Sequence, residues 1–174
     1  MSATGVALRP VRPDDGPFLR RLYASTRLEE LAPLGWSAAQ LELFLGQQFD
    51  AQHRHYWTRY PDAAFSVILL DRQPIGRLYA ARCPERILLL DIALLPAHRN
   101  AGIGTHLLGA LLAEAEQAGK PVRLHVERSN RALRLYERHG FSVVGDEGVY
   151  RCLEWVPARV GSAQPAARRV GAGG

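Results

Sequence analysis

The chain carries a glycine-bearing turn, Arg99-Asn100-Ala101-Gly102-Ile103-Gly104, between an apolar run and a helical pattern. The apolar run covers residues 87–95 and is followed by Pro96, and the helical pattern covers residues 105–118. A strand is therefore expected to end here, and a helix to begin. The first N–H groups of a helix have no partner within it and lie at the positive end of its dipole, which favours a bound phosphate or pyrophosphate. Residues without Cβ let the backbone approach such an anion and tolerate positive φ.

The turn differs from two other phosphate-binding patterns. The Rossmann fingerprint needs a third glycine after Gly102-x-Gly104 and an acidic residue about 20 positions further on, and both are missing. The P-loop ends in Gly-Lys-Ser/Thr, whereas the lysine of this chain, Lys120, stands far downstream beside Gly119. By itself the turn is compatible with a plain connection or with a phosphate site.

A second pattern lies downstream, in the segment VRLHVERSNRALRLYERHGF at residues 122–141. Together the two patterns strongly resemble the GNAT superfamily of N-acetyltransferases. The matching pieces are the Arg-x-x-Gly-x-Gly turn after the fourth strand and the run Asn-x-Ala-x-x-Leu-Tyr-Glu-x-x-Gly-Phe on the fourth helix. The resemblance covers roughly residues 8–155. The first third matches less well, and in that superfamily this part varies with the acceptor.

Length and composition agree with one compact domain. The chain has 174 residues, a formal charge of +5 and two cysteines, Cys83 and Cys152, without metal-ligand spacing. We expect buried, reduced thiols and no metal. No run approaches the roughly 20 apolar residues of a membrane span, so we expect a cytoplasmic protein without a membrane partner. The expected division is a flexible N-terminus (1–5), the domain (6–157) and a disordered Ala/Arg/Gly tail (158–174).

Residue patterns place strands and helices in an α+β order. Strands are expected at 6–11, 65–70, 75–81, 87–95, 122–126, 141–145 and 149–155, and helices at 17–27, after Ser37, at 105–118 and from Asn130 to Gly140. Ser37 and Asn130 suit helix N-caps, and Gly140 suits a left-handed position. The strand at 122–126, reached through a helix crossover, is expected to run parallel to 87–95. The resemblance implies a mixed, mostly antiparallel sheet of about six to seven strands flanked by about four helices.

The resemblance also implies a site for acetyl-CoA as co-substrate. Its pantetheine amides would pair with the backbone of Ile92, Ala93 and Leu94, where a diverging neighbour strand leaves donors and acceptors unpaired. Asn130 is both a helix cap and a CoA contact in this interpretation, and Arg99 is either a phosphate contact or a solvated loop charge. The pyrophosphate would lie on the N–H groups of Asn100, Ala101, Gly102, Ile103, Gly104 and Thr105.

Tyr136 is the predicted general acid, because the tyrosine of the Leu-Tyr-Glu run protonates the departing thiolate in similar enzymes. The alternative is a core tyrosine that packs near CoA. The acceptor amine must lose a proton before it attacks, since an alkylammonium has no lone pair. Asp91, His125 and Glu127 are candidate bases, together with a route through water alone. His125 alternates with Leu124 and Val126, so it is expected on the opposite face of its strand from them.

Acceptor choice is expected to lie in residues 28–36 and the helix that follows. Glu29 and Glu30 are candidates for attracting a cationic amine, with solvated charges as the alternative, and Trp36 and Tyr56, with Trp57, are candidates for an apolar or stacking wall. The tryptophans are also a candidate homodimer contact.

The leading hypothesis is an acetyl-CoA-dependent N-acetyltransferase acting, in a ternary complex, on a primary amine of a small molecule or a protein. A CoA-binding regulatory or assembly module that has lost catalysis is a second hypothesis. A nucleic-acid binder is a third, less favoured because the arginines are scattered along the chain; its candidate stripe is Arg128, Arg131, Arg134 and Arg138. The leading hypothesis involves no nucleic acid.

Overall fold

The computed structural model describes residues 5–158. The predicted flexible N-terminus and disordered tail lie outside the described residues, apart from Gly5 and Ala158, each of which makes a hydrogen bond to the domain. The elements are β1 (Val6–Pro10), α1 (Gly16–Leu31), α2 (Ala38–Arg59), β2 (Ala64–Leu70), β3 (Gln73–Arg82), β4 (Ile87–Leu94), α3 (Ile103–Ala118), β5 (Val122–Glu127), α4 (Leu133–Arg138), β6 (Ser142–Glu147) and β7 (Tyr150–Trp155), with short 3-10 turns at Pro13–Asp15, Ala32–Leu34 and Pro96–His98.

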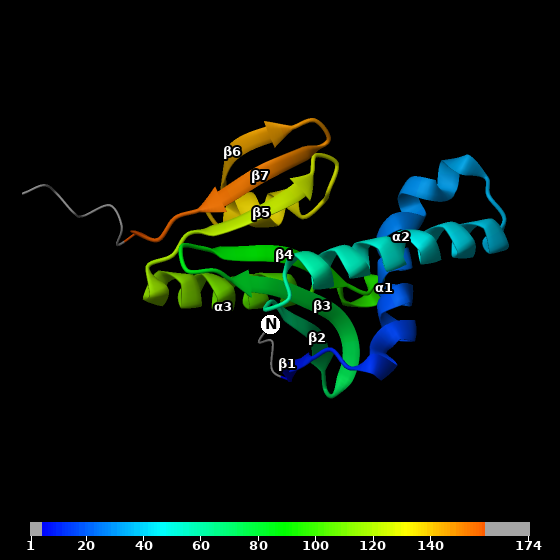
Figure 1. The fold of residues 1–174 in the computed structure, drawn as a ribbon, viewed down its shortest axis with the longest axis horizontal. Helices are drawn as coiled ribbons and strands as arrows, with labels where there is room; N and C mark the ends of the chain where they lie inside the picture. Colours follow the sequence, from blue (N-terminus) through cyan, green and yellow to red (C-terminus); the bar gives the residue numbers. More distant parts are fainter. Residues whose placement is uncertain (1–4, 159–174) are drawn as a thin grey trace, which may run out of the picture.

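A single seven-stranded sheet has the order β1-β2-β3-β4-β5-β7-β6 (Figure 1). β4 and β5 pair in parallel, and the other neighbouring strands pair antiparallel. The crossover from β4 to β5 runs through α3, as a parallel connection requires. The predicted α+β class and mostly antiparallel sheet are confirmed.

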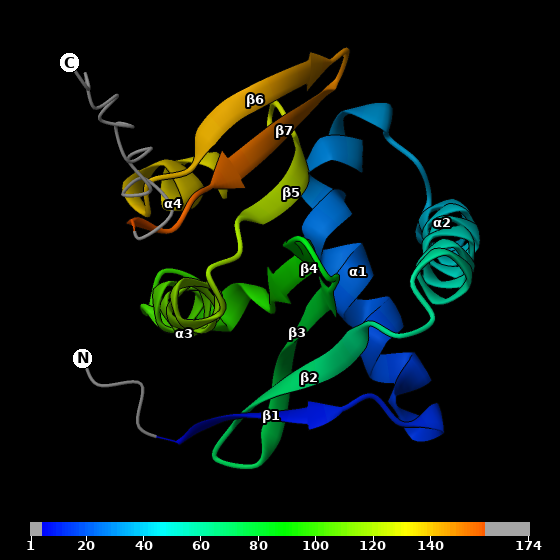
Figure 2. The same cartoon turned by 60° about the vertical axis from the view of Figure 1, so that its left-hand side comes forward.

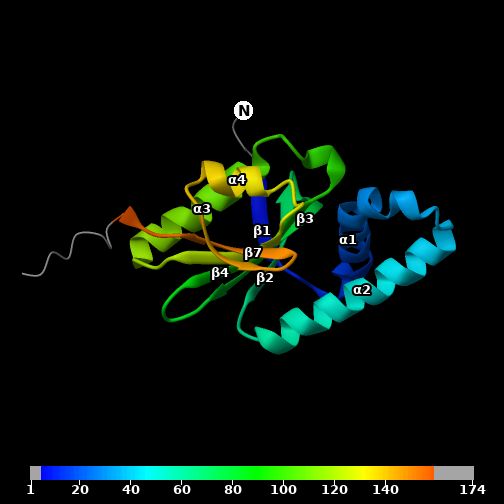
Figure 3. The same cartoon turned by 90° about the horizontal axis from the view of Figure 1, so that it is seen from above.

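The helices cover the two faces of the sheet. Figure 2 shows α3 and α4 on one face and α1 and α2 on the other, and Figure 3 shows the same layers from above. Each face has its own apolar core, because alternate strand residues point to opposite sides. Leu78, Leu124 and Tyr136 belong to the core under α3 and α4, whereas Val67 and Phe49 belong to the core under α1 and α2.

Several local predictions are confirmed. Ser37 caps α2, accepting a hydrogen bond from the N–H of Gln40 at 3.3 Å while the Gln40 side chain accepts one from the N–H of Ser37. Gly119, after α3, and Gly140, after α4, have φ of 64° and 86°, the left-handed conformation that ends a helix.

The bounds of two helices differ from the prediction. The α4 helix begins at Leu133, because the carboxamide of Asn130 first accepts a hydrogen bond from the N–H of Ala132 in a turn. The α1 helix begins at Gly16 and continues to Leu31, beyond the predicted end. The Asp15 carboxylate does not cap α1 and binds Arg9 and the N–H of Arg12 instead.

Candidate functional site

The parallel pair β4 and β5 separates after three residue pairs. The pairing runs from Ile87 opposite Val122 to Leu89 opposite Leu124, and from Asp91 to Leu94 β4 pairs only with β3. One edge of β4 therefore has no strand beside it over the stretch that contains Ile92, Ala93 and Leu94. Amide and carbonyl groups on such an edge can bind a ligand that carries amides of its own.

The turn before α3 lies at the end of this open edge. Asn100 and Gly102 have φ of 59° and 79°, so the chain turns through two left-handed residues before Ile103 begins the helix. Within residues 5–158, the backbone N–H groups of residues 100–105 donate no hydrogen bond. A Cβ on Gly104 would be 3.5 Å from a methyl group of Leu135 in α4, and one on Gly102 would meet no atom within 4 Å. This combination of free N–H groups and open space fits an anionic ligand.

Arg99 has a different position from either prediction. Its guanidinium donates hydrogen bonds to the carbonyl of Leu94 at 2.9 Å and to the carbonyl of Ser25 in α1 at 3.2 Å. The side chain therefore ties the end of β4 to α1, and it occupies one lone pair of the Leu94 carbonyl. Asn130 is close to its predicted capping role, although its partner is the N–H of Ala132 in the turn before α4.

Tyr136 projects from α4 into the core beside α3 and is 6% exposed. Its ring lies edge-on to Phe141, with the ring centroids 5.6 Å apart. Burial, and to a smaller degree the negative charge of Asp91, raises the pKa of the Tyr136 phenol, so the hydroxyl stays protonated at neutral pH.

Asp91, one of the three candidate bases, is held by a buried arginine. It forms an ion pair with Arg77 of β3, which lies two residues before Tyr79, the direct partner of Asp91, and is 3% exposed. Arg77 also donates a hydrogen bond to the side chain of Gln52 in α2 at 2.8 Å. A carboxylate that neutralises a buried guanidinium is poorly placed to accept a further proton, because protonation would leave the arginine charge uncompensated.

Glu127 is also engaged. Its carboxylate accepts a hydrogen bond from Arg27 of α1 at 3.1 Å and lies 3.5 Å from the hydroxyl of Tyr150. His125 differs from both other candidates, because its side chain makes no hydrogen bond or ion pair with any part of the chain that the structure describes. It is exposed and lies on the face opposite Leu124 and Val126, as the alternation predicts. Of the three candidate bases, His125 is therefore the one whose side chain is free to accept a proton from a bound amine.

The predicted acceptor residues do not form one cluster. Glu29 pairs with Arg131 at 2.5 Å and Glu30 with Arg27 at 3.4 Å, so both carboxylates have cationic partners already. The Glu29–Arg131 pair joins the end of α1 to the segment after β5, whereas the Glu30–Arg27 pair lies within α1.

The residues predicted to form an aromatic wall, Trp36, Tyr56 and Trp57, also contact different parts of the structure. Trp36 packs edge-on against Phe44 at 5.0 Å, and Trp57 stacks on Phe65 at 4.2 Å. Tyr56 points to the sheet and donates a hydrogen bond to the carbonyl of Leu90 at 3.1 Å.

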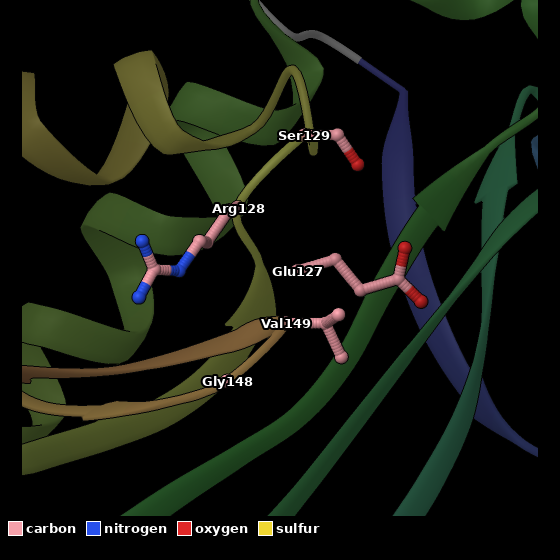
Figure 4. Close-up of a pocket in the computed structure, with 5 residues that line it drawn as sticks. All are labelled: Glu127, Arg128, Ser129, Gly148 and Val149. Carbon is pink, nitrogen blue, oxygen red and sulfur yellow. The ribbon is translucent and has the colours of Figure 1, made fainter.

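An open depression of about 550 Å³ lies where β5 ends and the β6–β7 turn passes it. In Figure 4 the side chains of Glu127 and Arg128 point in opposite directions, with Glu127 directed toward the central strands. Glu127 and His125 alternate along β5 and so share one face of that strand, but only Glu127 lines the depression. Its lining residues are Glu127, Arg128, Ser129, Gly148 and Val149.

The sequence prediction missed the polar group around Arg77. Tyr79 neighbours Arg77 on the same face, and its hydroxyl is buried and without a hydrogen-bond partner among the described residues. The available signal was an arginine and a tyrosine at alternate positions of an otherwise apolar strand, Ile75-Gly76-Arg77-Leu78-Tyr79, since buried charges need partners.

Other predicted features are placed as follows. Two of the four stripe arginines are in ion pairs, Arg128 with Asp146 and Arg131 with Glu29. Cys152 is buried as predicted, whereas Cys83 is only half-buried, and both are free thiols. Between Gly5 and Ala158, no helix combines the length and the apolar character that a membrane span needs, and no three metal-ligating side chains cluster.

Comparisons of the sequence with known proteins agree on one family. The model of the Acetyltransferase (GNAT) family matches residues 26–141. A curated relative, [Ribosomal protein bS18]-alanine N-acetyltransferase of Haemophilus influenzae, is 33% identical over 78 residues, which are 44% of this chain and 53% of the relative. The match thus spans about half the length of that relative.

Solved structures share the fold. The PaiA N-acetyltransferase of Thermoplasma acidophilum, in complex with coenzyme A, aligns with a TM-score of 0.67 and 20% identity over 90% of this chain and 99% of its own. Arabidopsis thaliana Naa50, in complex with the bisubstrate analogue CoA-Ac-MVNAL, aligns with a TM-score of 0.56 and 18% identity over 87% of this chain and 97% of its own.

Proposed function

Because this chain belongs to the GNAT family of acetyltransferases, we propose that it transfers an acetyl group from acetyl-CoA to a primary amine by direct attack in a ternary complex. The observation that carries the proposal is the open edge of β4 leading into the unpartnered N–H groups of the α3 turn. An acyl-CoA has amides along its arm and a pyrophosphate at its far end, so its two kinds of polar group match these two stretches of backbone in order.

The residues present fit acetyl-CoA. Residues 92–94 would hold the amide-bearing arm, residues 100–105 the pyrophosphate, and Asn130, in the turn before α4, would be a further contact to CoA. When bound, acetyl-CoA supplies an activated acetyl thioester. Arg99 contributes by fixing the end of β4 against α1.

Proton movements are assigned to two residues. His125 accepts the proton of the acceptor ammonium, because its ring nitrogens are available whereas Asp91 and Glu127 are bound by arginines. Tyr136 donates its phenolic proton to the leaving sulfur. Its raised pKa keeps the proton in place but makes it a weaker acid, so its contribution is expected at the low end for general acid catalysis.

The acceptor is proposed to be the α-amine of a peptide or protein. A relative is named as an N-acetyltransferase of an alanine of ribosomal protein bS18, and a structural neighbour is in complex with the bisubstrate analogue CoA-Ac-MVNAL. Such a chain end would arrive at the depression beside the β6–β7 turn, which is lined by Glu127, a residue on the same face of β5 as His125.

The proposal is tested by measuring thiol release from acetyl-CoA in the presence of peptides that begin with alanine, serine or methionine and of a panel of small primary amines. Amine-dependent release, with acetyl-peptide detected by mass spectrometry, is the expected result. Tight acetyl-CoA binding without release on any amine would favour the regulatory CoA-binding module. Absence of binding would contradict the proposal.

A further inference from the structure

A β-bulge in β4 coincides with the point where β4 leaves β5. Tyr79 of β3 pairs with Asp91 and the next residue, Ala80, pairs with Leu89, so Leu90 is the extra residue. The last residue of β4 that pairs with β5 is Leu89. A bulge bends its strand and increases the local twist. The extra residue is thus at the position where a bend would turn β4 away from its neighbour.

Tyr56 of α2 supplies the partner that this extra residue needs. Its hydroxyl donates a hydrogen bond to the Leu90 carbonyl at 3.1 Å, and its ring packs edge-on against Tyr79 with centroids 6.0 Å apart. Burial, with a smaller effect of Asp91, raises the pKa of the Tyr56 phenol, so it remains a donor. A carbonyl in a bulge has no ladder partner, and leaving it buried and unpaired costs free energy.

A second polar contact ties α2 to the same part of the sheet. Gln52 lies one helical turn before Tyr56 and accepts a hydrogen bond from Arg77, which in turn pairs with Asp91 directly after the bulge. The helix therefore holds the bulge at Leu90 through Tyr56 and the following residue through Arg77. These contacts lie on the face of the sheet away from Tyr136 and α3.

We propose that Tyr56 is a positioning residue: by holding the Leu90 carbonyl, it keeps the bulge in the form that opens the β4 edge to the amide-bearing arm of CoA. The inference rests on the proposed function, because it concerns the same ligand. It gives Tyr56 a role through β4 rather than in a wall of the acceptor site.

Comparing the binding of two ligands distinguishes this positioning role of Tyr56 from a general loss of stability. CoA needs both the β4 edge and the α3 turn, whereas its nucleotide half, 3′-phospho-ADP, needs only the turn. Tyr56→Phe removes the hydroxyl and keeps the ring. Tyr60→Phe, at the residue that directly follows α2, is a matched control, since the Tyr60 hydroxyl makes no hydrogen bond within residues 5–158. The experiment measures the dissociation constants of both ligands by titration calorimetry, and the melting temperatures by thermal unfolding, for the wild type and both variants.

We expect Tyr56→Phe to weaken CoA and acetyl-CoA binding by roughly five- to tenfold, the range of one net hydrogen bond, and to leave 3′-phospho-ADP binding unchanged. Tyr60→Phe should bind both ligands as the wild type does. Unchanged CoA affinity in Tyr56→Phe, or a parallel loss for both ligands that follows the fall in melting temperature, would overturn the inference while leaving the proposed function intact. A wild type that binds neither ligand would overturn both.

Discussion

Tyr136 and His125 lie on opposite faces of the sheet, near the place where β4 and β5 separate. Tyr136 belongs to the core under α3 and α4, whereas His125 faces the side of α1 and α2. The amine nitrogen forms a bond to the carbonyl carbon while the bond from that carbon to the thioester sulfur breaks, so a base beside the amine and an acid beside the leaving sulfur suit acyl transfer. The two roles are separable by single substitutions.

Tyr136→Phe removes the proposed acid and keeps the buried ring. We expect kcat to fall by roughly 10- to 100-fold, at or below the low end of general acid catalysis, with the acetyl-CoA dissociation constant little changed. Because its raised pKa keeps the phenol protonated, the alkaline side of the rate profile up to about pH 9 should have the same shape in both proteins. Steady-state thiol release and calorimetry measure these quantities. An unchanged kcat would assign Tyr136 to packing alone.

His125→Gln removes the proposed base. We expect kcat/KM to fall by roughly 10²- to 10³-fold, the range for loss of a general base, because glutamine cannot accept the proton of the acceptor ammonium. Glu127→Gln is the control, since it keeps the size of a side chain already bound by Arg27. The account is contradicted if Glu127→Gln lowers kcat/KM as much as His125→Gln does, or more.

At the scale of elements, the start of α1 depends on Asp15, which is 5% exposed. The hydrogen bonds from Arg9, at 2.7 Å, hold the pKa of this carboxyl below its usual value. A carboxyl with a lowered folded-state pKa stabilises the protein above its unfolded-state pKa of about 3.9, and this contribution is lost as the pH falls through the folded-state value.

Asp15→Asn is therefore expected to lower the free energy of unfolding by about 1–3 kcal/mol at pH 7, the range of a charge-assisted hydrogen bond. The difference from wild type should shrink as the pH falls below about 4, where the wild-type carboxyl also begins to lose its charge. Urea unfolding at a series of pH values measures it. Asp14→Asn, at an exposed neighbour, should show no such trend; a difference for Asp15→Asn that is constant with pH would refute the explanation.

The pairing of β3 with β4 depends on a glycine. A Cβ on Gly76 would lie 2.3 Å from the carbonyl oxygen of Ala93, so Gly76→Ala must displace β4. We expect it to lower the free energy of unfolding by roughly 2–4 kcal/mol and to weaken acetyl-CoA binding. Gly109→Ala in α3 meets no atom within 4 Å and should stabilise the protein by about 0.5–1 kcal/mol. Equal, small effects of both substitutions would contradict this packing.

The order and type of the main elements could be predicted from the sequence because their signals are local. Alternation marked the strands, Ser37 and Gly119 marked helix ends, and the crossover length marked the parallel pair. The start of α4 was wrong by a few residues, since Asn130 can serve a turn or a helix with the same side chain.

At the scale of the whole molecule, the contacts that define the site join distant parts of the chain. Arg27 meets Glu127, Glu29 meets Arg131, and Tyr56 meets Leu90. No local pattern specifies such partners, because each depends on how α1 and α2 lie on the sheet. For this reason the sequence identified the α3 turn, with its own local signature, but not the arginine partners of the candidate bases.

The same arrangement brings the proposed CoA path, the proposed acid and the proposed base together around β4 and β5. β4 carries the bulge at Leu90 and leads into the α3 turn, and α4 adds Tyr136 from one face. On the other face β5 carries His125 and Glu127, and α1 supplies Arg27, which binds Glu127. The central claim is that acetyl-CoA lies along this path.

Amide hydrogen exchange, resolved by residue and measured with and without saturating acetyl-CoA, tests that claim most directly. Backbone N–H groups without partners exchange rapidly, and those bound by a ligand are protected. The account predicts that protection appears at residues 92–94 and 100–105, while residues 65–70 in β2 change little. Protection elsewhere in the domain, or none at these two stretches under saturating ligand, would contradict it.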